Sequence, residues 1–130
     1  MTEREAATLP ERPGFLVLVF TAPAIWAAHF VVSYATASIW CARYAGPGGP
    51  LDPIRAVIVV YTIVALGAIA FVGWGGYRRH GYGSGTAPHD EDTPEDRHRF
   101  LGLATMLLAG LSGVATAFVA MSAMFFDTCR

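Results

Sequence analysis

Three runs without a charged residue, 13–42, 56–77 and 100–126, constrain this chain more than any other feature of its sequence. Each run matches or exceeds the ~20 apolar residues that an α-helix needs to span a bilayer. A core helix of a soluble protein keeps a polar face, whereas these segments are apolar all round. The sequence therefore predicts an all-α membrane protein with three transmembrane helices, which form a single transmembrane domain over residues 1–130.

The residues between the runs set the helix boundaries, because prolines, glycines and arginines gather there. They place the three helices at about 14–43, 54–77 and 98–127. A short, turn-rich connection, 44–53, follows the first helix, and a longer loop, 78–97, follows the second. Pro23 lies inside the first helix, where its ring removes one backbone donor, so we expect a kink at this position.

The arginines are unequally divided between the two ends of the predicted helices. Six flank the side that carries the N-terminus and the 78–97 loop, and three flank the other side. Because cytoplasmic segments of membrane proteins carry the excess of positive charge, we expect the N-terminus and this loop in the cytoplasm. The 44–53 loop and the C-terminus would then be periplasmic. The absence of Lys, Asn and Gln beside abundant Ala, Gly and Arg is typical of a GC-rich bacterium, so the expected location is a bacterial inner membrane.

Composition and charge exclude several functions. The formal net charge is -1, which leaves no basic patch for nucleic acid. All ten acidic residues lie outside the three runs, so a proton pathway would lack intramembrane acids. Polar side chains inside the runs are too few for an enzyme. A small oligomeric channel or transporter stays an alternative, although the Ser and Thr residues are sparse for a pore lining.

The first run carries the most unusual polar group of the predicted membrane segments. His29 lies near the middle of the run, where an unpaired imidazole is costly, so we expect it to be neutral and hydrogen-bonded. Trp26, Ser33 and Thr36 recur on the same helical face and complete the candidate intramembrane polar contact. Candidate partners of His29 within the bundle are Ser33, Thr36, Tyr61 and Ser112. The alternatives are a hydrogen bond to a partner subunit and ligation of a haem iron. Haem ligation normally needs a second axial ligand, and no other histidine lies at that depth.

Small residues of the third helix recur at the spacing of a packing face. Helices in lipid associate through close contact of small side chains and through hydrogen bonds. The residues concerned are Ala109, Ser112, Gly113 and Thr116. This face is expected either to close the three-helix bundle or to dock against another protein.

The two cysteines end the first and third helices. These helices point the same way in a three-helix hairpin, so Cys41 and Cys129 lie at the same membrane face. Because that face is expected to be periplasmic and oxidising, the pair is a disulfide candidate. A copper(I) site with Met121 or Met124 and independent free thiols are the alternatives.

The segment APAIWAAHF, from Ala22 to Phe30, together with Tyr34, Cys41 and Cys129, resembles small three-helix bacterial inner-membrane proteins encoded with haem-copper cytochrome oxidase subunits. The resemblance implies only a setting, namely a respiratory membrane complex. The scarcity of polar groups, the face around His29 and the small-residue face lead us to expect a non-catalytic accessory subunit of a larger membrane complex, above all a respiratory terminal oxidase. We expect no cofactor in this chain, although a partner subunit could hold haem or copper. The alternative is a haem- or copper-handling redox protein that uses His29 or the cysteine pair.

Overall fold

The computed structural model describes residues 13–80 and 94–129, and three long α-helices make up most of this part of the chain. The helices are α2 (Pro13–Trp40), α3 (Asp52–His80) and α4 (Pro94–Phe125), and one π-helical turn, η1 (Cys41–Ala45), extends α2. All three helices are long and apolar enough to cross a membrane. The described residues contain no strand, only one isolated bridge between Pro50 and Thr128. The described part of the chain is therefore all-helical, and its helices are of the membrane-spanning type.

The observed helix ends differ by a few residues from those the sequence predicts. The first helix continues through η1 to Ala45, and the second extends to His80. The third begins at Pro94, where a proline suits the first turn, and it ends at Phe125 because the chain then turns toward the α2–α3 connection. Most of the predicted 78–97 loop lies outside the described residues.

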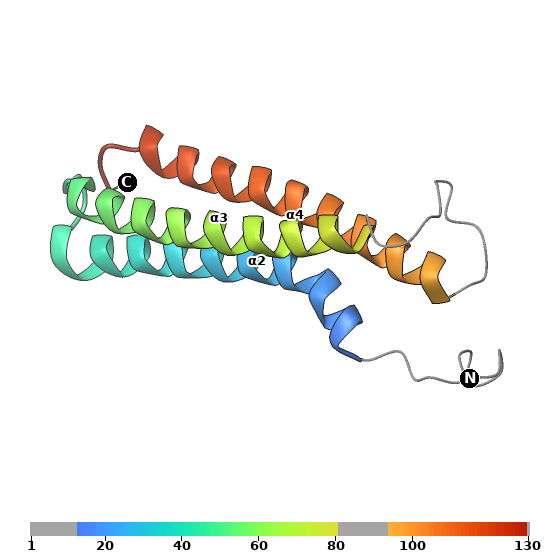
Figure 1. Cartoon of the computed structure of the whole chain (residues 1–130). Coiled ribbons are helices and arrows are strands. Elements are labelled where there is room, and N and C mark those ends of the chain that lie inside the picture. Colours follow the sequence, from blue (N-terminus) through green and yellow to red (C-terminus); the bar gives the residue numbers. More distant parts are fainter. Residues whose placement is uncertain (1–12, 81–93, 130) are drawn as a thin grey trace.

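The three helices form one bundle in which α2 and α4 point the same way and α3 runs opposite to them (Figure 1). All three pairs of helices are in contact, and α3 and α4 share the largest interface. The first turns of α2 bend away from the other two helices (Figure 1), and Pro23 lies within this helix. A bend in the N-terminal part of α2 agrees with the kink expected for a helix that contains a proline.

The interior of the bundle is built from small and polar side chains. Its apolar centre consists of Ala22, Ile69 and Ala109. The buried polar or charged side chains within the described parts of these helices are His29, Ser33, Thr62, Arg99, Thr105, Ser112 and Thr116, of which Arg99 lies at the very start of the third apolar span. Large apolar side chains lie outside instead, as in Phe71 and Phe125, which are 74% and 78% exposed. This distribution is the reverse of that in a soluble protein and is consistent with a multi-pass membrane protein.

The interface between α3 and α4 is close enough to require glycine. A Cβ atom on Gly76 would lie 2.8 Å from the backbone oxygen of Gly102, and one on Gly73 would lie 3.1 Å from the Cβ of Ala109. Two helices that approach in this way gain dispersion contacts along their backbones. The interface therefore depends on a missing side chain at Gly76.

The small residues that the sequence marks as a packing face lie at or beside these helix interfaces. Ala109, Ser112 and Thr116 are buried within the bundle. Gly113 is half-buried, and a Cβ atom there would lie 3.8 Å from Cγ2 of Ile69 on α3. In the chain alone, this face is used for packing between its own helices.

Candidate functional site

His29 forms the central polar contact between α2 and α3. The side chain is 5% exposed, and its Nε2 lies 3.0 Å from Oγ1 of Thr62. The Thr62 hydroxyl donates its only hydrogen to the backbone oxygen of Ile58 at 2.7 Å, so toward His29 its oxygen accepts a hydrogen bond. His29 therefore carries its proton on Nε2. Oγ of Ser33, one turn further along α2, lies 3.5 Å from the same nitrogen.

The second ring nitrogen of His29 has an unused lone pair. Nδ1 is buried and has no hydrogen-bond partner among the described residues. An open groove of about 310 Å³ runs along the α2–α3 interface beside His29, and small residues such as Ala28, Ala65 and Ala68 line it. A buried acceptor without a donor costs about 1–3 kcal/mol. The imidazole thus fixes the contact between two helices and keeps one unsatisfied acceptor.

The structure brings together only part of the polar face that the sequence defines. His29 and Ser33 are buried, whereas Trp26 is 36% exposed on the outer surface. Thr36 donates its hydroxyl proton to the backbone oxygen of Val32, so its bond lies within its own helix. The observed partner, Thr62, was not among the partners expected for His29.

A periodic signal for Thr62 was present in the sequence. Ile58, Thr62, Ala65 and Ile69 follow one another at helical spacing, and all four are buried. A threonine on the inward stripe of a helix in lipid is a natural partner for a histidine at a similar depth. The pattern identifies the stripe, but the rotation of α3 about its axis decides which helix the stripe faces.

A disulfide joins Cys41 to Cys129 at the end of the bundle where α2 and α4 terminate. The Cα atoms of the two cysteines are 5.6 Å apart. The cysteines that the sequence proposes as a candidate pair are thus at bonding distance. Three backbone hydrogen bonds join the same tail to the α2–α3 connection. They run from Gly48 N to the Cys129 oxygen (2.7 Å), from Cys129 N to the Gly49 oxygen (2.9 Å) and from Leu51 N to the Asp127 oxygen (3.2 Å). Because each sulfur is bonded to the other, a copper(I) dithiolate site would first require reduction.

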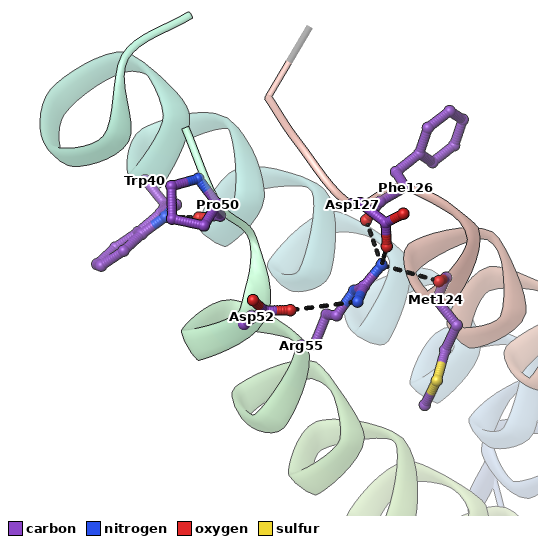
Figure 2. A network of polar contacts seen from close by, with 7 residues as sticks. All are labelled: Trp40, Pro50, Asp52, Arg55, Met124, Phe126 and Asp127. Atoms are coloured by element: carbon purple, nitrogen blue, oxygen red, sulfur yellow. Dashed lines mark hydrogen bonds and ion pairs between the residues drawn. The ribbon is translucent and has the colours of Figure 1, made fainter. Parts of the chain in front are cut away.

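Arg55 binds the C-terminal end of α4 from the first turn of α3 (Figure 2). Its Nη2 donates to the backbone oxygens of Met124 (2.9 Å) and Phe126 (2.7 Å) and pairs with the carboxylate of Asp127. Its Nη1 lies 3.3 Å from Asp52, one turn earlier in α3. A cation at this place satisfies carbonyls that the helix leaves unpaired and opposes the negative end of the helix dipole. In the sequence Arg55 is one of the three arginines that flank the predicted periplasmic side, and its role at the end of α4 is not predicted.

A row of aromatic side chains covers the outer face of α2. We call Trp26, Phe30 and Tyr34 the aromatic ladder. Their ring centroids are 6.5 Å and 6.3 Å apart in succession, and Tyr34 is 69% exposed. The indole N–H of Trp26 and the hydroxyl of Tyr34 have no hydrogen-bond partner among the described residues, whereas the N–H of Trp40 donates to the backbone oxygen of Pro50 (Figure 2). The ladder thus offers two free donors on an otherwise apolar surface.

The arrangement of these groups defines a class of protein rather than a reaction. Over residues 13–80 and 94–129, no three His, Cys, Asp or Glu side chains gather closely enough to hold a metal ion. The described part of the chain is a disulfide-closed bundle of three helices with the length and apolarity to span a membrane. No protein-family model, curated protein or solved structure matches this chain.

Proposed function

We propose that this chain is a non-catalytic accessory subunit that spans a bacterial inner membrane three times and docks on a larger integral membrane complex. The arginine distribution supports a cytoplasmic N-terminus and a periplasmic C-terminus. The bond between Cys41 and Cys129 supports the same orientation, because disulfides persist in the oxidising periplasm and are rare in the cytoplasm.

The aromatic ladder is the observation that carries this proposal. Trp and Tyr in membrane proteins are enriched at the two interfaces, where their polar atoms reach water. Trp26 instead lies well inside the apolar span of α2, and its N–H points to no acceptor in the described chain. Lipid tails offer no acceptor, whereas a second protein offers backbone or side-chain oxygens. A neighbouring subunit therefore satisfies a donor that lipid leaves unpaired.

The resemblance of the Ala22 to Phe30 segment favours a respiratory terminal oxidase as the larger complex. In such an assembly the haem or copper would belong to the partner, and this chain would contribute contacts and lipid exclusion. The buried hydroxyls support a structural role, because Thr105 and Thr116 each donate to a backbone oxygen of their own helix. They are used inside the bundle and do not converge on a substrate.

Purification of the tagged chain from its native membrane in mild detergent tests the proposal. We expect a larger integral membrane protein to be retained in a fixed ratio, as measured by mass spectrometry of the eluted complex. Trp26→Leu should weaken this retention by about tenfold, since hydrogen bonds between membrane helices contribute ~1–2 kcal/mol. Phe71→Leu is the matched control, because Phe71 is 74% exposed on another helix, α3.

Recovery of the wild-type chain alone would contradict the proposal. Equal loss of the partner in both variants would show that the ladder has no specific role. A haem absorption band from the chain without a partner would favour the alternative, a redox protein that uses His29.

A further inference from the structure

The C-terminal part of α3 carries a row of exposed side chains that ends in a cation. Phe71, Trp74 and Arg78 follow one another at helical spacing, so they share one face of the helix. All three are exposed, Phe71 by 74% and Trp74 by 59%. Gly73 and Gly76 lie against α4 instead, so the row points away from the interface between these two helices. The row is therefore an outer surface of the bundle.

The guanidinium of Arg78 is positioned by an aromatic ring. Its Cζ lies 5.6 Å from the ring centroid of Trp74, one turn earlier in the helix. Among the described residues, Arg78 has no hydrogen bond and no carboxylate partner. Arg55, at the other end of α3, is engaged with two carboxylates and with backbone oxygens. Arg78 thus keeps its N–H donors and its charge for a group outside the described chain.

The length of α3 sets the depth of this cation in a membrane. An α-helix advances ~1.5 Å per residue, so Trp74 lies about 33 Å along the axis from Asp52, where α3 begins. The hydrocarbon core of a bilayer is ~30 Å thick. Trp40 marks the opposite boundary, because its N–H bonds to the backbone oxygen of Pro50, just before α3. In a spanning bundle, the guanidinium over Trp74 therefore lies where hydrocarbon meets the headgroups.

The acceptors at this depth are the phosphates of phospholipids. A guanidinium presents paired N–H groups that match two oxygens of one phosphate. The exposed rings of Phe71 and Trp74 offer apolar surface to the acyl chains below that phosphate. A single guanidinium does not recognise the rest of the headgroup, so the phosphodiester is the group selected. The rival partners of Arg78 are the acidic side chains between positions 90 and 96 of the same chain.

We propose that Phe71, Trp74 and Arg78 bind one phospholipid. Its phosphate accepts hydrogen bonds from the Arg78 guanidinium, and its acyl chains lie along the two rings. This inference rests on the membrane placement within the proposed function, but not on docking to a partner. Carbonate extraction of membranes that contain the chain tests the placement by itself, so a failure of the placement is distinguished from a failure of the lipid site.

Native mass spectrometry of the delipidated, detergent-purified chain tests the site. Dioleoylphosphatidylglycerol and dioleoylphosphatidylcholine carry the phosphodiester, whereas dioleoylglycerol lacks it. We expect one equivalent of either phospholipid to be retained, and no dioleoylglycerol. Arg78→Gln should reduce phospholipid binding about tenfold, because charge-assisted hydrogen bonds are lost. Arg78→Lys should keep part of the binding, because it keeps the charge but not the paired donors.

Arg43→Gln is the matched control. It removes the same charge at an exposed position of η1, where no contact with an aromatic ring holds the guanidinium in the described chain, so it should bind as the wild type does. Circular dichroism and the mass of the closed disulfide confirm that each variant is folded before binding is compared.

Four outcomes would each overturn the proposal. The first is retention of no phospholipid, which is expected if the acidic side chains at 90–96 occupy Arg78. The second is equal binding by Arg78→Gln and Arg43→Gln. The third is retention of dioleoylglycerol as well as the phospholipids, and the fourth is retention of phosphatidylglycerol alone, because net charge rather than the phosphodiester would then be selected.

Discussion

Loss of the disulfide gives the most quantitative test of how this bundle is stabilised. Cys41 and Cys129 are 88 residues apart in sequence, so their bond closes a loop that contains most of the chain. The chain-entropy relation for a loop of this length gives about 4.6 kcal/mol of stabilisation at room temperature. This is an upper value, because the unfolded chain in a micelle keeps helical segments and has less freedom to lose. We therefore expect Cys41→Ser to lower the free energy of unfolding by about 2–4.5 kcal/mol.

The remaining contacts at this end should not compensate for the lost bond. The tail would be held by three backbone hydrogen bonds and by Arg55, and a typical hydrogen bond contributes only about 1 kcal/mol net. Separation of the tail from α2 should therefore precede loss of the α3–α4 interface. The emission of Trp40, next to Cys41, reports on the first event, and circular dichroism reports on the second.

Equilibrium unfolding in mixed micelles of dodecyl sulfate and dodecyl maltoside measures these losses. Cys41→Ser, Cys129→Ser and the double variant should lose the same free energy, because each change removes the same single bond. Reductant should lower the stability of the wild type to the same level and should not affect the double variant. Additive losses in the two single variants, or a loss below about 1 kcal/mol, would refute the reasoning.

Two further predictions concern the contacts between α3 and its neighbours. Gly76→Ala should destabilise the bundle by about 1–3 kcal/mol, since its Cβ would lie 2.8 Å from a backbone oxygen of α4. Gly75→Ala is the control, because a Cβ there meets nothing within 4 Å, and it should be neutral in the same unfolding assay. Equal effects of the two substitutions would contradict this packing. Thr62→Val and His29→Leu should preserve membrane insertion and lower stability by about 0.6–1.7 kcal/mol, and a double-mutant cycle should show coupling because the two side chains share one hydrogen bond. Strict additivity in that cycle would show that the contact contributes nothing.

The helices and their order could be predicted because hydropathy is a local property of the sequence. A charge-free run of sufficient length specifies a membrane-type helix without knowledge of its neighbours. Topology then places the ends of the first and third helices together, which suffices to bring Cys41 and Cys129 to the same end. These inferences need no knowledge of how each helix is rotated about its axis.

The site residues depend on that rotation, and there the sequence was less informative. His29 stood out because an imidazole is rare at this depth, but its partner Thr62 is one of several hydroxyls in the runs. Trp26 shares a broad helical face with His29, yet α3 covers only part of that face and leaves the indole outside. Arg55 looked like an ordinary flanking charge because its acceptors belong to the end of another helix, 69 residues away or more.

The contacts between helices are distributed along the whole length of the bundle. The disulfide and Arg55 act at one end, the bond from His29 to Thr62 acts in the middle, and the close approach at Gly76 acts near the C-terminal end of α3. The disulfide joins η1 to the C-terminal tail, and His29 joins α2 to α3. Arg55 and Gly76 both join α3 to α4, but at opposite ends of α3, so none of these contacts replaces another. The bundle is therefore fixed by its own interior, and its exposed donors are not needed for its stability.

The polar groups of the outer surface therefore differ in role from the polar groups of the interior. The buried hydroxyls of Thr62, Thr105 and Thr116 donate to backbone oxygens one turn earlier in their own helices, so they offer no proton to another protein. The indole of Trp26 lies outside this internal network. Because an apolar surface gives little specificity in lipid, the proposed docking role assigns partner recognition to a free donor on that surface. If a partner is present, the orientation of docking should follow the aromatic ladder rather than the largest apolar area.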